Sequence, residues 1–224
     1  MPIARLLMLF SYFVISISQL HAKSIDVIAV EFPPFTTTHE PDNGINFVQL
    51  RDYFKEQYQL TIQPQILPSA RAQQTIAEGD WCLSFYPPAD PKAYSFIKLS
   101  PEKVNLGFYR VKQDAPFLWS DLTELKGQSV AVLRYRQKGM LHNLLTQAGL
   151  TIVPVSSIEQ GLKMLSYERV DLVFSSQKNA YLDSLPLAEQ AQFQFSDSSL
   201  LEADVGVFVN PKCQPLLDAA KLQQ

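Results

Sequence analysis

The 224-residue sequence has few glycines and carries no block of one charge. Its eight glycines form no phosphate-binding loop, and the Gly-x-Ser-x-Gly turn of many hydrolases is missing. The formal net charge of -3 comes from scattered residues and leaves no basic stripe of the kind that binds nucleic acid. These absences argue against a nucleic-acid partner and leave little basis for an enzyme.

Histidine and cysteine are scarce as well. His39 and His142 lie far apart and have no companion at metal-ligand spacing, so we expect them on the solvated surface and expect no metal site or cofactor. The two cysteines are Cys82 and Cys213. A chain of this size does not depend on a disulfide, so the sequence leaves open whether they form one or are two small buried residues.

The one long apolar run stands at the start of the chain and is too short to span a membrane. Residues 6–17 are almost entirely apolar, follow Arg5 and lead through a short polar stretch to the small residue Ala22. This order is typical of a secretory signal peptide rather than of an uncleaved anchor. We expect residues 1–22 to be removed by cleavage after Ala22 and the mature protein to be periplasmic.

The rest of the chain alternates β-rich runs with amphipathic runs. The expected strands cover residues 25–30, 60–66, 81–85, 129–133, 151–155 and 171–175. The expected helices cover residues 45–58, 69–78, 139–148 and a stretch from Ser157, paired with Gln160 in a capping box, to about Tyr167. Such alternation predicts an α/β fold with mostly parallel sheets flanked by helices.

The pattern of helix end, turn and apolar strand occurs twice, at residues 77–85 and at residues 166–174. Two such units predict two lobes with a crevice between the carboxyl ends of their strands. A further strand over residues 203–209 is expected to return to the first lobe, so that the chain crosses near residues 104–110 and 200–203. The predicted domains are residues 23–106 with 203–224 as lobe one, and 107–202 as lobe two.

In this order the segments resemble the family 3 extracellular solute-binding proteins, the polar-amino-acid type with the type II periplasmic-binding fold. The resemblance covers the mature chain and rests on Glu31-Phe32-Pro33-Pro34-Phe35 and on residues 77–85, 99–101, 122–133 and 168–173. It implies a non-enzymatic monomer that captures a small polar molecule for an ABC-type transporter. It also implies an inner-membrane permease or sensor as partner.

The ligand segments depart from the family pattern. Residues 86–92 carry neither the arginine nor the threonine that hold a ligand carboxylate in the family, and Pro87 and Pro88 offer no backbone N–H. Ser175 and Ser176 stand where relatives often carry an aspartate for the ligand ammonium. An ordinary α-amino acid is therefore a poor candidate for the ligand.

Positive charge near the predicted crevice suggests an anion instead. Arg71 stands early in one expected helix, and Arg136 and Lys138 precede the start of another, where free N–H groups favour negative charge. An arginine fork suits a carboxylate or a phosphate. Arg71 and Arg136 are expected to face each other across the crevice; the alternative is that these cations are solvated surface charges.

Three further residues complete the expected ligand site. Phe35 and Tyr86 are expected to wall the ligand, with plain lobe packing as the equal alternative, and Ser175 is expected to contact it. The sequence leaves two other functions open. A sensing or accessory module would bind a ligand without a transporter, and a few relatives of this fold are lyases that use a crevice carboxylate, for which Glu31 and Asp90 are the candidates.

Overall fold

The computed structural model describes residues 24–136 and 138–222, so the expected signal peptide and its cleavage point lie outside the described residues. The strands are β1 (Ser24–Val30), β2 (Thr61–Leu67), β3 (Leu83–Ser84), β4 (Ser95–Val111), β5 (Ser129–Leu133), β6 (Thr151–Val155), β7 (Leu172–Ser176), β8 (Phe193–Phe195) and β9 (Leu201–Val209). The α-helices are α1 (Ile45–Gln57), α2 (Ser69–Glu78), α3 (Met140–Gln147), α4 (Ile158–Ser166), α5 (Ala180–Ser184), α6 (Leu187–Gln190) and α7 (Gln214–Lys221). Short 3₁₀ turns are η1 (Pro91–Ala93), η2 (Leu122–Leu125) and η3 (Pro211–Cys213).

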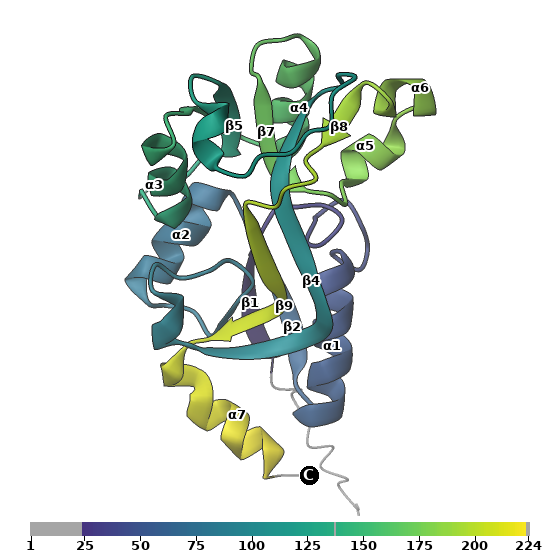
Figure 1. The fold of residues 1–224 in the computed structure, drawn as a ribbon. Helices are drawn as coiled ribbons and strands as arrows, with labels where there is room; N and C mark the ends of the chain where they lie inside the picture. The colour runs from purple at the N-terminus through teal and green to yellow at the C-terminus, as the bar shows by residue number, and fades with distance from the viewer. Residues whose placement is uncertain (1–23, 137, 223–224) are drawn as a thin grey trace, which may run out of the picture.

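The strands form one mixed sheet in the order β2-β1-β3-β9-β4-β7-β5-β6, and β8 pairs with β4 (Figure 1). In one half β1 runs parallel to both β2 and β3, and in the other half β5 runs parallel to both β6 and β7. The expectation of mostly parallel pairing therefore holds for these two sets of strands. It fails for β4 and β9, which pair antiparallel with each other and with their neighbours.

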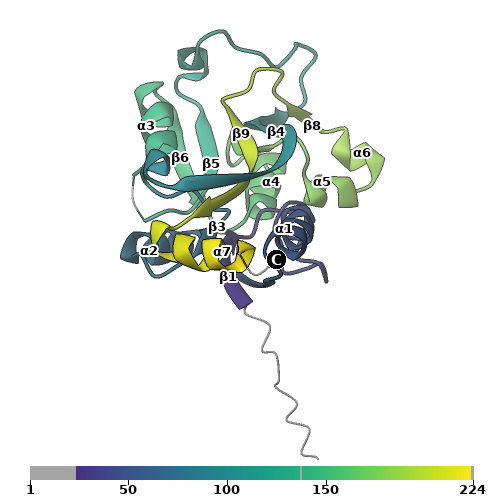
Figure 2. The same ribbon diagram turned by 90° about the horizontal axis from the view of Figure 1, so that it is seen from below.

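The first lobe is a sheet with helices on both faces. The side chains that α1, β1 and α7 bury together, among them Val27, Phe47, Phe54 and Leu217, form one apolar cluster. Ala72 and Ile76 of α2 and the neighbouring Trp81 form a second cluster with Ile28 on the opposite face. Figure 2, the view from below, shows α1, α2 and α7 gathered around β1 and β3.

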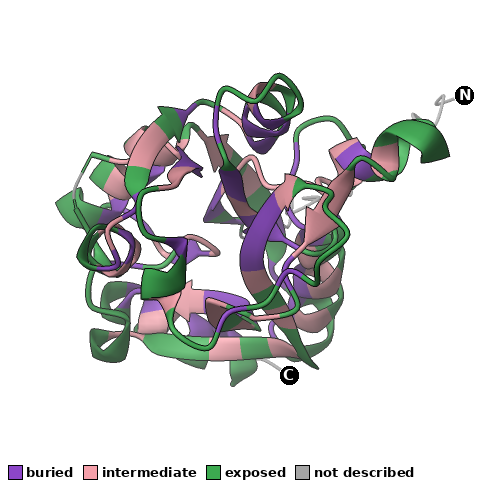
Figure 3. Cartoon of the chain, turned by 45° about the horizontal axis from the view of Figure 1, so that its top comes forward, coloured by how far each residue is buried: buried purple, intermediate pink, exposed green. Residues whose placement is uncertain are grey.

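The second lobe repeats this arrangement. Val130 and Leu172 of its strands pack with Leu145 of α3 in one cluster. Val173 packs with Leu162 of α4 in another. Three of the five residues of β5 are buried, and Figure 3 colours buried positions purple. Burying both faces of a sheet is what nearly continuous apolar strands such as β5 require.

Strands β4 and β9 connect the two lobes. Val104 pairs with Ala203, so the two expected crossing points lie opposite each other in this ribbon, and the register shifts between Lys98 and Lys103. The other end of β9 pairs with β3, which places that strand in the first-lobe sheet. The exact domain boundaries stay a prediction.

The local predictions are confirmed for most elements and wrong in two details. Ser157 caps α4 by accepting from the Gln160 backbone N–H at 3.1 Å, but the Gln160 side chain accepts from Ser156 at 2.8 Å and not from Ser157. Strand β3 is shorter than expected; Trp81 lies before it, is buried and donates its indole N–H to the carbonyl of Ile76 at 3.0 Å. Pro64 lies on β2, an edge strand, where a sheet tolerates proline.

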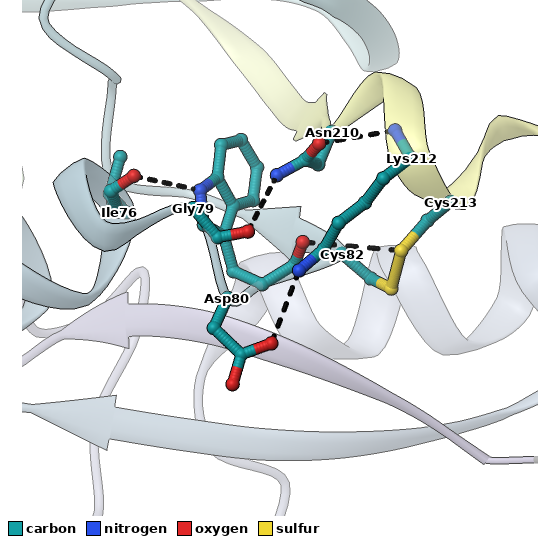
Figure 4. Close-up of polar contacts among 8 residues, drawn as sticks. Ile76, Gly79, Asp80, Cys82, Asn210, Lys212 and Cys213 are labelled. Carbon is teal, nitrogen blue, oxygen red and sulfur yellow. Dashed lines mark hydrogen bonds and ion pairs between the residues drawn. A yellow bond between two sulfur atoms is a disulfide. The ribbon is translucent and has the colours of Figure 1, made fainter.

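A disulfide joins Cys82 to Cys213 and settles the alternative that the sequence leaves open (Figure 4). Polar contacts surround it. The Asn210 backbone N–H donates to the Cys82 carbonyl at 2.8 Å, the Asn210 side chain donates to the Gly79 carbonyl at 3.3 Å, and Lys212 pairs with Asp80 at 3.1 Å. The segment that begins α7 is thereby fixed to the turn between α2 and β3.

Candidate functional site

In the first lobe the register of the strands brings three connecting segments to one sheet edge. Val30 pairs with Leu67, and Ile28 pairs with Ser84, so the parallel strands β1, β2 and β3 end side by side. The segment that begins with Glu31, the start of α2 and the segment around Tyr86 therefore lie at the same edge. Open α/β sheets bind ligands at this edge.

The second lobe has the same construction. Leu133 pairs with Val155, and Ala131 pairs with Val173, so the carboxyl ends of β5, β6 and β7 also lie together. The residues that follow β5 are Arg134 to Arg136, and Gly139 then begins α3 without a side-chain cap. This edge of the second lobe thus carries exposed arginines and an uncapped helix start.

A direct contact shows that the two edges face each other. The Arg136 backbone N–H donates to the side-chain oxygen of Gln73 at 2.6 Å, and its guanidinium Nη1 donates to the side-chain oxygen of Gln74. Gln74 in turn donates its side-chain amide to Glu78 at 2.7 Å. These residues, with Ala77, line an open pocket of about 450 Å³ between α2 and the segment that follows β5.

Arg71 lies on the same helix, one turn before Gln74. Residues three apart on a helix are neighbours on its surface, roughly 5–6 Å between their Cβ atoms. The Arg71 side chain is exposed and makes no hydrogen bond or ion pair within the described residues. Arg136 therefore contacts α2 one turn after the position of Arg71, and the role of both residues in ligand binding stays a prediction.

Phe35 lies behind another aromatic residue at this edge. Phe35 is 8% exposed and stacks with Phe32 at a ring distance of 6.0 Å. Phe32, partly buried, packs against the second-lobe cluster that contains Val155 and Leu162. Phe32 thus contacts the opposite lobe, and the site prediction omitted it, although the motif Phe32-Pro33-Pro34-Phe35 contained the signal.

The loop that presents these two rings is held by backbone contacts. The Phe32 N–H donates to the Thr36 carbonyl at 2.8 Å, and the Phe35 carbonyl accepts from the N–H of Asn46 at 2.9 Å, at the start of α1. Gly44 has φ +91°, and a Cβ atom there would lie 2.6 Å from the Phe35 carbonyl oxygen. Only glycine fits this close approach.

The remaining predicted residues, Tyr86 and Ser175, are engaged within their own lobes. Tyr86 is half-buried and packs against the cluster formed by Ala72, Ile76 and Trp81. Ser175 is 1% exposed, and its hydroxyl oxygen accepts from the side-chain amide of Asn179 at 3.2 Å. Both lie at the carboxyl edge of a sheet, and their contact with a ligand stays a prediction.

The two carboxylates named for a lyase reaction differ in setting. Asp90 is exposed and accepts from the backbone N–H of Lys92 at 3.3 Å, so it caps a 3₁₀ turn. Glu31 accepts through Oε2 from Thr38 at 3.1 Å, while its Oε1 is buried and has no hydrogen-bond partner within the described residues. A buried polar atom of this kind needs an explanation, because leaving it unsatisfied costs free energy.

One histidine lies close to the site, contrary to the expectation that both are solvated. His142 of α3 is half-buried, and its Nδ1 shares a 2.5 Å hydrogen bond with the hydroxyl of Tyr135. Partial burial raises the pKa of Tyr135 above its ordinary value. No cluster of three or more potential metal ligands occurs in residues 24–136 and 138–222.

No protein-family model and no curated sequence matches this chain. Solved structures do match it. Holo ArgBP from T. maritima has a TM-score of 0.64 at 15% identity, with 89% of this chain and 88% of that chain covered. The GluR0 ligand-binding core from Nostoc punctiforme in complex with L-glutamate has a TM-score of 0.64 at 16% identity, with 89% and 92% covered. The VFT2 domain of BvgS from Bordetella pertussis has a TM-score of 0.65 at 16% identity, with 88% and 85% covered.

These similarities extend over nearly the whole described chain and confirm the expected fold. The protein has the two-lobed α/β architecture of these binding proteins and ligand-binding modules. At this level of identity a common fold does not transfer a ligand, because function depends on the residues of the site and not on the fold. No helix in the described part of the chain has the length and hydropathy to cross a bilayer.

Proposed function

We propose that the chain is a periplasmic solute-binding protein that captures a small polar molecule between its lobes and delivers it to an ABC-type transporter. The observation that carries this proposal is the meeting of the two sheet edges at Arg136, Gln73 and Gln74, one helical turn from Arg71. A crevice bounded by two rigid lobes and a two-strand connection permits closure around a ligand. The proposal includes no catalytic step.

The charges at this crevice favour an anionic ligand. Arg71 has no partner within the described residues, and an arginine carries five N–H donors, so the bond from Arg136 to Gln74 leaves donors for a carboxylate or phosphate. Lys138 is also exposed near the start of α3. Each charge-assisted hydrogen bond contributes about 1.5–3 kcal/mol, which corresponds to roughly tenfold or more in affinity.

The walls of the proposed site come from both lobes. Phe35 supports Phe32 from the first lobe, Tyr86 lies against α2, and Ser175 lies at the end of β7 in the second. An aromatic wall with a few polar groups is the usual composition of a small-molecule site.

A thermal-shift screen of carboxylates, phosphates, amino acids and sugars tests the proposal. An anion should raise the melting temperature of the wild type, and calorimetry should show at least about tenfold weaker binding to Arg71→Ala. Arg169→Ala is the matched control, because Arg169 is an exposed arginine of the second lobe that packs on Tyr167. Stabilisation by neutral or cationic compounds alone, or an unchanged affinity of Arg71→Ala, would reject the anion site.

A sensing module without a transporter is the second candidate. It is favoured by the similarity to the GluR0 ligand-binding core and the BvgS VFT2 domain, whose names describe parts of larger proteins. Uptake of the radiolabelled ligand by cells with and without this protein separates the two candidates. Transport predicts loss of uptake in its absence, and sensing predicts unchanged uptake.

A further inference from the structure

We propose that Arg136, Gln73, Gln74 and Glu78 form a latch that holds the two lobes together in the absence of ligand. The inference rests on the proposed function, because it concerns how closure around the same crevice is controlled. It assigns Gln74 and Glu78 a part that neither the sequence pattern nor the fold assigns.

The geometry of the latch is specific on both sides. Arg136 makes two bonds to consecutive side chains of α2, one from its backbone N–H to Gln73 and one from its guanidinium to Gln74. The backbone bond fixes the position of the segment that follows β5, and the side-chain bond adds a charged donor. Two bonds from one residue to one rigid helix restrict sliding as well as separation.

Glu78 orients the acceptor. An amide side chain has a donating and an accepting end. The Gln74 amide nitrogen donates to Glu78 Oε1 at 2.7 Å, so its oxygen is turned toward Arg136. The carboxylate also polarises the amide and strengthens the bond that the oxygen accepts, because hydrogen bonds in a chain reinforce one another.

An apolar contact supports the latch from a different segment. Phe32 of the first lobe packs against the second-lobe cluster that includes Val155 and Leu162. The lobes are thus joined by a polar contact through α2 and by an apolar contact through the loop after β1. Both contacts join protein atoms of one lobe directly to protein atoms of the other.

The latch has a consequence for binding. The apparent affinity of a ligand falls in proportion to the fraction of protein in the binding-competent state. A ligand that is retained only in the closed state is therefore bound more tightly by a protein that is already latched. Because the Arg136 and Gln74 side chains are exposed, loss of the bond between them should raise the open-to-closed ratio about fivefold.

Spin-label distance measurements on the ligand-free protein test the latch. Lys92→Cys and Asn143→Cys place labels at exposed positions in the first and second lobes, and the native cysteines are already joined to each other. Unfolding in urea and refolding with the disulfide intact removes bound ligand. The wild type should give one dominant short distance.

Three substitutions should move this distribution toward longer distances. Arg136→Ala and Gln74→Ala should add a longer-distance population, with an open-to-closed ratio about five times that of the wild type. Glu78→Ala removes the carboxylate that orients the Gln74 amide and should raise the same ratio by less. Arg169→Ala is the matched control and should leave the distribution unchanged. All four positions are exposed, and circular dichroism verifies that each variant is folded.

The outcomes separate this inference from the proposed function. The latch is overturned if the ligand-free wild type shows mainly the long spin-label distance. It is also overturned if the wild type, Arg136→Ala and Gln74→Ala give identical distance distributions. Both results hold whatever the protein binds. Arg71→Ala should weaken anion binding without changing the distances of the ligand-free protein. A latched protein that binds no anion would support the latch and reject the anion site.

Discussion

Cys82 and Cys213 are joined by a disulfide across 131 positions of sequence, and the loop that this bond closes contains the entire second lobe. The bond fixes the returning chain to the first lobe directly after β9. Within the described residues the chain then crosses between the lobes through β4 and β9. The disulfide, a glycine in the loop after β1, a buried tyrosine and the ion pairs between β4 and β9 lead to four predictions.

Removing the disulfide should lower stability strongly. By the loop-entropy model a loop of this length contributes up to about 5 kcal/mol to the free energy of unfolding. Urea denaturation of Cys82→Ser/Cys213→Ser should show this loss against the oxidised wild type. Reductant should destabilise the wild type and leave the double variant unchanged; a wild type insensitive to full reduction would contradict the prediction.

Gly44→Ala should cost more stability than Gly79→Ala. Both glycines have positive φ, so both substitutions strain the backbone. A Cβ atom at Gly44 would also meet the Phe35 carbonyl oxygen at 2.6 Å, whereas nothing lies within 4 Å of a Cβ at Gly79. We expect about 1–3 kcal/mol of additional loss at Gly44, measured by chemical denaturation. Equal losses would mean that the loop moves away at little cost.

Ionisation of Tyr109 should lower the free energy of unfolding at alkaline pH. Burial, and then the charge of Asp183, raise the pKa of Tyr109 above its ordinary value of 10.0, and its hydroxyl donates to the Gln177 carbonyl at 2.5 Å. The folded state therefore holds this proton more tightly than the unfolded state does. The resulting stability is fully present below about pH 10 and is lost as pH rises toward the folded pKa, by up to about 1.4 kcal/mol per pH unit.

Tyr109→Phe should remove this part of the alkaline slope, seen in urea titrations between pH 9 and about pH 11. The substitution also removes the bond to Gln177, so the informative quantity is the slope and not the absolute stability. Tyr167→Phe is the control, because Tyr167 is 72% exposed. An unchanged slope in Tyr109→Phe would show that this tyrosine does not govern the transition.

The two ion pairs of the connecting ribbon should contribute little. Lys98 pairs with Asp204 at 2.9 Å and Lys103 pairs with Glu202 at 3.1 Å, and all four side chains are about half exposed. Exposed pairs contribute less than about 1 kcal/mol because water and salt screen them. A double-mutant cycle on Lys98→Ala and Asp204→Ala should give a coupling below that value, and a larger coupling would mean that the ribbon geometry shields the pair.

Much of the local structure was determined by sequence. The apolar spacing in residues 69–78 predicts α2 with the bounds that it has, and residues 129–133 and 151–155 predict β5 and β6 equally well. These elements form because short-range periodicity decides which face is apolar, and burial in the folded protein agrees with that choice. The repeat of this local pattern was enough to indicate two lobes.

The connecting ribbon and the candidate site were decided by tertiary structure. β4 contains Pro101 and a register shift, so its 17 residues carry no simple strand pattern, and only pairing with β9, a hundred positions later, makes them a strand. The sequence indicates Phe35 and Arg136 as site residues and places Phe32 in the same motif as Phe35, but it does not indicate what these side chains contact. Which ring contacts the opposite lobe, and which glutamines receive Arg136, depends on how two separately folded surfaces meet, and short-range sequence patterns contain no information about that meeting.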